Sequence, residues 1–471
     1  MQTTLAPEFR DTPDGQEAEA ILRRCVHCGF CTATCPTYQI LGDELDGPRG
    51  RIYLIKQALE GQPVTRTTQE HLDRCLTCRN CETTCPSGVE YGKLVEIGRR
   101  VVDERVTRPL PERLLRGALK SGLTSPAFTP ALRVGQMLRP ALPKRLQAKV
   151  PPREKAARNV PALGTHARKM LMLAGCVQPA LAPNINEATR RVLDAAGIET
   201  VYAKGAGCCG AIRLHTSDHD GGLADMRRNI DAWWPLIESG EIEAIVMNAS
   251  GCGVTVREYG YSLRTDPAYA EKARRVSELT RDLSELLPEL VESLGQRLPA
   301  LRGVRLAVHP PCTLQHGQQQ RGGIEAGLRA LGCEVSTAGH EAHLCCGSAG
   351  TYSVLQPEIA TALRDRKLAQ LLPQEPQAIV SANIGCIQHL QGGTAVPVQH
   401  WVEVLDAALV SGPAAISRPS PRRAAPAQTT APSRRRVADP AALPATRPAG
   451  KPKGKGGTRH PARRGKGRKR R

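Results

Sequence analysis

The chain has 471 residues, enough for two to four domains with buried cores. Residues 1–20 are polar and acidic and no run of 18 apolar residues occurs, so we expect neither a secretory signal nor a membrane span, and we expect a cytoplasmic protein. The net charge of +20 comes mostly from residues 412–471, which carry +17, and aromatic residues at 3% are too scarce for a single-strand nucleic-acid binder.

Two cysteine runs near the start of the chain share one pattern. Residues 25–36 read CVHCGFCTATCP, and residues 75–86 read CLTCRNCETTCP, at an offset of 50. This spacing is typical of two-cluster ferredoxins, in which the cysteine before the proline binds the other cluster. It predicts two [4Fe–4S] clusters, one held by Cys25, Cys28, Cys31 and Cys85 and the other by Cys75, Cys78, Cys81 and Cys35.

Zinc and disulfides are the alternatives for these cysteines. A zinc site needs four ligands in one place and gives no reason for the exchanged fourth cysteine. Disulfide frameworks belong mostly to small secreted domains. Two complete copies, each with its proline, therefore favour iron–sulfur clusters.

Helical patterns surround both cysteine runs. Apolar residues fall on one face in residues 48–60 and again in residues 89–107. The 39 residues between Cys35 and Cys75 are more than a compact β-type ferredoxin needs. We predict an α-helical ferredoxin domain over residues 1–105.

A basic, proline-rich segment follows at residues 106–166. Residues 101–165 contain 13 Lys and Arg against four Asp and Glu, and nine prolines from Pro109 to Pro161 predict short pieces. One interpretation is a linker packed over its neighbours. The other is a basic amphipathic surface for the inner face of the membrane or for a partner subunit.

From residue 168 the pattern becomes α/β. Strands are predicted at 169–175, 199–203, 243–249, 304–310, 333–338 and 378–382. Helices are predicted between them at 184–196, 222–238, 314–331 and 356–371. Strands that alternate with helices imply parallel sheets. We predict a first α/β unit over residues 167–295 and a second over 296–411, so the fold class is α+β multidomain with a disordered basic tail at 412–471.

The cysteines of the two α/β units repeat in register. Cys176, Cys208, Cys209 and Cys252 recur as Cys312, Cys345, Cys346 and Cys386. Each unit contains a Cys-Cys-Gly (CCG) step, and its first and last cysteines follow strands, so four thiols are expected to meet at the carboxyl ends of the strands. An additional iron–sulfur site, thiol redox chemistry and a structural role all remain open. Cys333 stands outside the repeat and is expected in the core.

Three histidines lie near these cysteines or at strand ends: His309, His316 and His400. A histidine there could ligate iron or tune its potential through a hydrogen bond. We favour ordinary hydrogen-bonded histidines, because most buried polar groups are satisfied in this way.

The phrases DGPRGRIYLIKQALEG, HLDRCLTCRNCETTCPSGVEYGKLVEIGR and HPPCTLQH resemble the family of iron–sulfur subunits of bacterial glycolate oxidase, over about residues 10–410. The resemblance implies a complex with two flavoprotein-type subunits, in which glycolate is oxidised on flavin. The clusters on this chain would carry electrons to a quinone or other membrane acceptor. No flavin is expected on this chain, and its localisation would be cytoplasmic or peripheral on the inner membrane face.

One departure from related patterns concerns the α/β units. Many CCG proteins end each unit with C-x-x-C, whereas Cys252 and Cys386 are single. The alternative functions are a CCG-type thiol–disulfide reductase subunit and a lactate-utilisation iron–sulfur protein. A third reading, an iron–sulfur protein whose basic tail binds nucleic acid, is disfavoured, so no specific nucleic-acid partner is expected. No catalytic residue is predicted, since no general base or nucleophile stands out.

Overall fold

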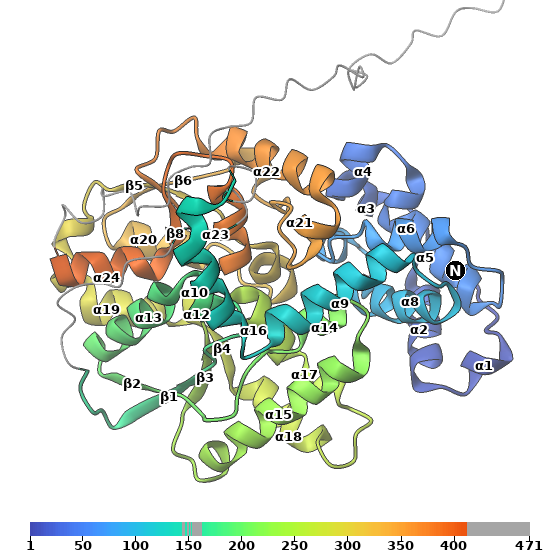
Figure 1. The fold of residues 1–471 in the computed structure, drawn as a ribbon, viewed down its shortest axis with the longest axis horizontal. Coiled ribbons are helices and arrows are strands. Elements are labelled where there is room, and N and C mark those ends of the chain that lie inside the picture. Colours follow the sequence, from blue (N-terminus) through green and yellow to red (C-terminus); the bar gives the residue numbers. More distant parts are fainter. Residues whose placement is uncertain (144–146, 148–149, 151, 153–162, 412–471) are drawn as a thin grey trace, which may run out of the picture. The chain divides into compact units, whose positions relative to one another are not determined.

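The computed structural model describes residues 1–143, 147, 150, 152 and 163–411 (Figure 1). The predicted disordered tail lies outside these residues, as does part of the predicted linker. Among the described residues, no helix is both long enough and apolar enough to cross a bilayer.

The N-terminal region is helical, as the sequence predicts. Its helices are α1 (Pro7–Arg10), α2 (Pro13–Arg24), α3 (Phe30–Ala33), α4 (Pro36–Leu41), α5 (Pro48–Leu59), α6 (Arg66–Asp73), α7 (Asn80–Thr84) and α8 (Tyr91–Arg105). Helix α5 begins with a proline in its first turn, where no backbone donor is lost. Its buried Ile52, Ile55 and Leu59 join Leu94 and Ile97 of α8 in one core, which holds the cysteine loops between helices.

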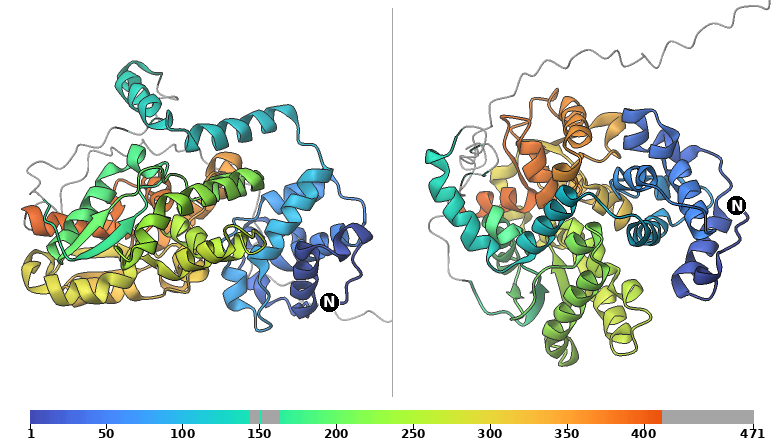
Figure 2. Two further views of the ribbon diagram at one scale, coloured as in Figure 1. Left: turned by 90° about the horizontal axis from the view of Figure 1, so that it is seen from below. Right: turned by 45° about the vertical axis from the view of Figure 1, so that its right-hand side comes forward.

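Two helices follow this region where short pieces were expected. They are α9 (Leu110–Thr124) and α10 (Phe128–Leu138), and they are visible as separate teal helices in Figure 2. The prediction of short pieces is wrong here because the prolines lie in the first turns of the helices. A proline is tolerated in a first turn. Pro111 is the second residue of α9 and Pro130 the third residue of α10.

Each α/β unit has a four-stranded parallel sheet, which confirms the predicted class. The first sheet has the order β2-β1-β3-β4 and the second β6-β5-β7-β8. Their strands are β1 (Arg168–Met172), β2 (Ile198–Val201), β3 (Ala244–Met247), β4 (Thr280–Asp282), β5 (Arg305–Val308), β6 (Glu334–Thr337), β7 (Ala378–Ser381) and β8 (Val398–His400).

Three of the four helices predicted in the α/β units are present, at 184–196, 222–238 and 356–371, whereas the one predicted at 314–331 is not; the sequence misses the other helices. The helices of the two units are α12 (Gln178–Leu181), α13 (Pro183–Ala195), α14 (Ala211–His215), α15 (His219–Glu238), α16 (Ser250–Arg257), α17 (Tyr259–Ser262), α18 (Ala270–Leu279), α19 (Leu287–Leu294), α20 (Gly323–Ala330), α21 (Tyr352–Leu355), α22 (Pro357–Leu371), α23 (Ile384–Gln391) and α24 (Trp401–Ser411). A π-helical turn, Thr313–Gly317, precedes α20 instead of one long helix. Gln319 and Gly322, which lie between this turn and α20, adopt positive φ angles of 58° and 74°, so the chain is not helical there.

The two α/β units share one hydrophobic core. Met170 and Val246 of the first sheet belong to the same buried cluster as Leu306, Val380 and Trp401 of the second unit. Helices α13 and α24 are in contact. The shared core therefore fixes the cysteines of the first α/β unit relative to those of the second.

Candidate iron–sulfur centres

The two N-terminal cysteine loops share one backbone conformation. His27 and Thr77 occupy equivalent positions with φ of 56° and 52°, and Gly29 and Arg79 with φ of 86° and 60°. Each loop then enters a short helix, α3 or α7, and these two helices are in contact. The sequence repeat is therefore a structural repeat, and both loops present their cysteines in the same way.

The first group of cysteines lies near the surface. The pKa of Cys31 is raised to about 11, first by burial and then by the neighbouring thiols of Cys25, Cys85 and Cys28. A small cavity of about 30 Å³ lies among these four side chains. Cys28 is exposed. Four thiols from both loops around one cavity fit the ligand set of an iron–sulfur cluster.

The second group of cysteines is buried. Burial raises the pKa of Cys81 well above its ordinary value, and Cys78, Cys75 and Cys35 act in the same direction because they lie close by. All four side chains are at most 9% exposed. This group also draws three cysteines from one loop and one from the other, and it fits a second cluster.

Two buried or half-buried arginines lie beside the second group, and sequence reasoning missed both. Although burial alone raises the pKa of Cys75, the charges of Arg51 and Arg99 hold it below its ordinary value. Arg51 is 1% exposed; its Nη1 donates to Thr37 Oγ1 at 3.1 Å, and it pairs with Asp46. Arg99 Nη2 donates to the carbonyl oxygen of Cys75 at 2.7 Å. These charges favour the anionic state of a cluster at this site.

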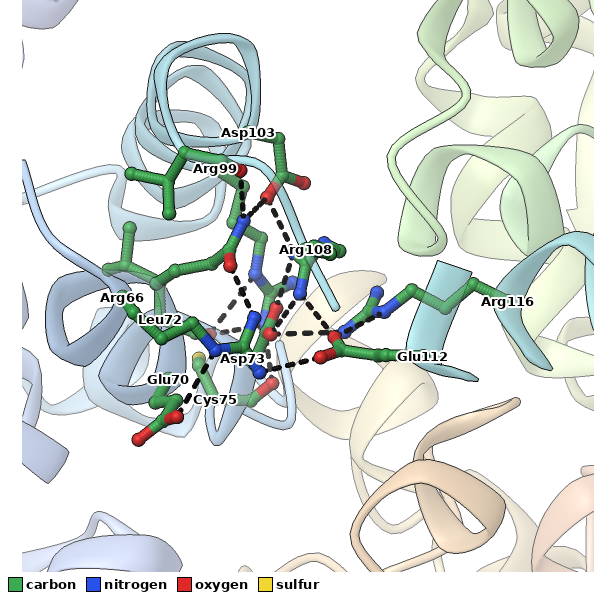
Figure 3. Close-up of polar contacts among 12 residues, drawn as sticks. Arg66, Glu70, Leu72, Asp73, Cys75, Arg99, Asp103, Arg108, Glu112 and Arg116 are labelled. Carbon is green, nitrogen blue, oxygen red and sulfur yellow. Dashed lines mark hydrogen bonds and ion pairs between the residues drawn. The ribbon is translucent and has the colours of Figure 1, made fainter. Parts of the chain in front are cut away.

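An ion-pair network ties α9 to the loop that carries Cys75 (Figure 3). Arg108 contacts Asp73 with Nη2–Oδ1 at 3.0 Å and Glu112 with Nη1–Oε1 at 2.6 Å. Arg116 of α9 reaches Asp73 at 3.1 Å. Because Asp73 ends helix α6, two residues before Cys75, the network holds α9 next to the second cysteine group.

The first α/β unit brings its four cysteines into one chain of sulfur contacts. Cys208 interacts with Cys176 and Cys209, and Cys209 interacts with Cys252. The interaction with Cys176 is the main reason that the pKa of Cys208 is lowered, while the pKa of Cys176 is raised. The thiol of Cys208 therefore has more anionic character than those of Cys176 and Cys209.

The second α/β unit repeats this arrangement. Cys312 and Cys345 have their Sγ atoms 3.7 Å apart, Cys345 interacts with Cys346, and Cys346 interacts with Cys386. All four side chains are buried. Each unit thus offers four neighbouring sulfur atoms to a metal centre.

The glycine of each CCG step adopts a left-handed backbone conformation that turns the chain there. Gly210 and Gly347 have φ of 97° and 91°. Their backbone N–H groups donate to the Sγ atoms of Cys208 and Cys345, each at 3.4 Å. A left-handed residue at this point is nearly always glycine.

The second ferredoxin group meets the second α/β unit directly. Cys78, Cys312 and Cys345 belong to one buried cluster together with Leu76 and Tyr352. A cavity of about 530 Å³ lies at this junction and has walls from all three cysteine-bearing parts, including Cys75, Cys78, Cys176, Cys209, Cys252, Cys312, Cys345 and Cys386. Sulfur atoms therefore run from the surface group through the buried group into the α/β units.

The three histidines differ in their partners. His316 bonds through both ring nitrogens, Nδ1 to Thr83 Oγ1 at 3.0 Å and Nε2 to the carbonyl oxygen of His343 at 2.9 Å. In His400, Nδ1 accepts from the Val402 N–H at 3.1 Å. His309 has no hydrogen-bond partner on either ring nitrogen within the described residues. The expectation of a hydrogen-bonded histidine is wrong for His309.

Comparison with known proteins agrees with this geometry. The family model described as a 4Fe-4S dicluster domain matches residues 21–89, and the one described as a cysteine-rich domain matches residues 170–257 and 306–391. The glycolate oxidase iron-sulfur subunit of Escherichia coli (strain K12) is 55% identical, over 87% of this chain and 99% of its own. The "Probable glycolate oxidase iron-sulfur subunit" of Bacillus subtilis (strain 168) is 30% identical, over 82% of this chain and 91% of its own.

A more distant relative covers a smaller part. Lactate utilization protein A of Bacillus velezensis is 28% identical over 50% of this chain and 99% of its own. The matched domains support [4Fe–4S] clusters and an electron-transfer role for the chain. From the dicluster domain, the paired cysteine-rich domains and the identity over most of its length, the chain belongs to the family of glycolate oxidase iron–sulfur subunits.

Proposed function

We propose that this chain is the electron-transfer subunit of a glycolate-oxidising complex, in which it takes electrons from two flavoprotein-type subunits and passes them to a membrane acceptor such as a quinone. The name of the Escherichia coli relative supports glycolate as the substrate. The observation that carries the proposal is the unbroken succession of cysteine groups from exposed Cys28 to the buried contact of Cys78 with Cys312 and Cys345.

In this proposal the first cluster is held by Cys25, Cys28, Cys31 and Cys85, and the second by Cys35, Cys75, Cys78 and Cys81. When bound, each [4Fe–4S] cluster accepts and releases one electron at a time, over a range of potentials that the protein sets. Arg51 and Arg99 would raise the potential at the second site, since their charges favour the more negative reduced state.

The two ends of this path differ in exposure, which suggests where partners bind. Val26 and Phe30 flank the exposed Cys28 and are themselves 68% and 61% exposed. Exposed apolar side chains beside a ligand loop are suited to the docking of a flavoprotein subunit. We propose that electrons enter here.

A second exposed apolar surface lies on α9 and α10. We propose that it rests on the membrane, because apolar side chains here alternate with basic ones such as Arg113 and Arg133. The exposed apolar side chains of this surface, called the α9–α10 surface below, are Leu110, Leu114, Leu115, Val134, Met137 and Leu138. A peripheral position on the inner membrane face follows from this proposal.

The test is reduction by substrate. The chain is purified anaerobically with its flavoprotein partners, glycolate is added, and the EPR signals of the reduced clusters are followed; a quinone analogue is then added. We expect glycolate to produce the signals and the quinone to remove them. Clusters that dithionite reduces but glycolate does not would contradict the proposal.

A second candidate function rests on the sulfur pair Cys312 and Cys345, whose Sγ atoms are 3.7 Å apart. Thiols this close can exchange with a disulfide substrate, as in a thiol–disulfide reductase. Reduction of a small disulfide by the isolated chain, lost in Cys345→Ser, would favour this candidate. Faster reduction by lactate than by glycolate would instead favour a lactate-utilisation protein.

A further inference from the structure

The second α/β unit contains a buried histidine, His309. His309 is 1% exposed, and neither Nδ1 nor Nε2 has a hydrogen-bond partner within the described residues. Burying such a ring without a partner costs free energy, and a bound ion is one of the explanations for an unpaired buried polar group.

Two cysteines lie close to this ring. A ring nitrogen of His309 and the Sγ atoms of Cys346 and Cys386 all lie within 4.8 Å of one another, and all three residues are buried. Metal–sulfur bonds of about 2.3 Å and metal–nitrogen bonds of about 2.0–2.1 Å place two donors of one ion at most about 4.6 Å apart. The three donors are thus close enough to share one ion after small side-chain movements.

The backbone holds the histidine in place at this position. His309 directly follows β5, its N–H donates to the carbonyl oxygen of Val380 at 2.8 Å, and its own carbonyl accepts from Ser381 Oγ at 2.9 Å. Both partners belong to the neighbouring strand β7. The backbone from which the ring extends is therefore fixed at the carboxyl end of the sheet, and Cys386 follows β7 at the same end.

The first α/β unit lacks this histidine. Three residues before Cys312 stands His309, whereas three residues before Cys176 stands Leu173, which is 4% exposed and packs in the apolar core. The second unit also buries Lys367, close enough to Cys345 and Cys346 to interact with their charges, while no Lys or Arg is among the buried residues of α15 in the first unit. The two units are therefore chemically different despite their matching cysteines.

We propose that His309 is a direct ligand of an iron ion in a metal centre of the second α/β unit, where it binds the same ion as Cys346 and Cys386. This inference rests on the proposed electron-transfer function and adds a nitrogen ligand that the first unit cannot provide. A neutral imidazole in place of a thiolate raises the potential of an iron–sulfur centre. The second unit would then be the more strongly electron-accepting of the two.

The test is pulsed EPR of the full chain labelled with [15N]histidine and reduced anaerobically. We expect a strong coupling between the electron spin and one histidine nitrogen. It should be lost in His309→Leu, which introduces the residue of the first unit, and kept in the matched control His316→Gln, since both ring nitrogens of His316 are already bonded within the protein. In His309→Cys we expect the iron to stay, the coupling to vanish and the potential to fall.

Three outcomes would overturn the inference. A coupling that survives in His309→Leu would assign it to another histidine. Iron in the second unit without any histidine coupling would show that His309 is not a ligand of that iron. Equal iron content in the unmodified chain and in Cys346→Ser would mean that the second unit holds no iron, and the electron-transfer function would still stand on the ferredoxin signals. Loss of those signals in the unmodified chain would instead refute the proposed function itself.

Discussion

Thr83 Oγ1 lies 3.0 Å from His316 Nδ1, and this contact joins the second ferredoxin loop to the second α/β unit. Tyr352 supports the same junction through its hydroxyl, which donates to the carbonyl oxygen of Arg74 at 2.9 Å. Together they hold Cys78 against Cys312 and Cys345. The first α/β unit has its own polar link to the ferredoxin region, in which Tyr261 donates to Glu17 at 2.6 Å.

Loss of the Arg51 charge should destabilise the ferredoxin region. In Arg51→Met, Asp46 keeps Arg74 and His71 as partners, but the buried Thr37 Oγ1 and the carbonyl oxygen of His71 each lose a donor. Leaving a buried polar group unsatisfied costs about 1–3 kcal/mol. We expect a lower free energy of unfolding in anaerobic denaturation. Arg23→Met is the control, because Arg23 and Glu19 form a solvent-exposed pair worth about 0.3–0.5 kcal/mol. Equal effects of the two changes would contradict the structure.

A methyl group at the CCG glycine of the second unit should be poorly tolerated. In Gly347→Ala the new Cβ would overlap the carbonyl oxygen of Ala360, in addition to the cost of about 1–2 kcal/mol of a left-handed residue. Gly350→Ala is the matched control, with φ of 63° and no atom within 4 Å of the new Cβ. We expect a clearly larger drop in melting temperature for Gly347→Ala. A comparable drop in both variants would show that the overlap does not matter.

Stability should fall as the pH rises past the ordinary pKa of Asp282. Burial raises the pKa of this carboxyl from 3.8 to about 6 in the folded chain. Between these values the folded state keeps a proton that the unfolded state loses, so about 3 kcal/mol of stability present below pH 3.8 is lost by pH 6. Asp282→Asn keeps the acceptor for the Ser284 N–H and removes the titration.

The check is the unfolding midpoint in denaturant between pH 4.5 and 6.5, measured without oxygen. As the pH rises, the midpoint of the unmodified chain should fall relative to that of Asp282→Asn. Parallel curves would mean that Asp282 does not titrate in this range in the folded chain.

The α9–α10 surface should bind anionic membranes. Replacing Leu114 and Met137, which are 65% and 66% exposed, by serine removes apolar area from this surface without opening a core. We expect several-fold weaker binding to vesicles that contain phosphatidylglycerol, measured by sedimentation. Val354→Ser, at an exposed apolar position on α21, is the control and should bind as before. Unchanged binding in the double variant would place the membrane contact elsewhere.

The features that can be predicted from the sequence are those that depend on a short-range residue pattern. Cysteine spacing indicates the two ferredoxin loops, and apolar runs locate strands such as β3 and β7. Strand β4 reads Thr-Arg-Asp and has no apolar run, so only its pairing with β3 reveals it. Pairing of this kind depends on tertiary context that no local window contains.

The charged neighbours of the cysteines could be predicted only in part. Arg51 lies four residues before Ile55 and eight before Leu59, and Lys367 lies four residues after Leu363, so both stand on apolar helix faces. This position is a signal that they are buried, but the partner of each depends on the tertiary fold. That neither ring nitrogen of His309 has a hydrogen-bond partner among the described residues is likewise a property of the folded unit, since both ring nitrogens of His316, only seven residues away, are bonded.

The most direct test of the electron-transfer function is the metal content of the anaerobically purified chain together with low-temperature EPR of its reduced form. Two ferredoxin clusters predict about eight irons per chain with interacting [4Fe–4S] signals, and iron in excess of eight measures the α/β units. Zinc in place of iron, in protein never exposed to air, would contradict the electron-transfer function.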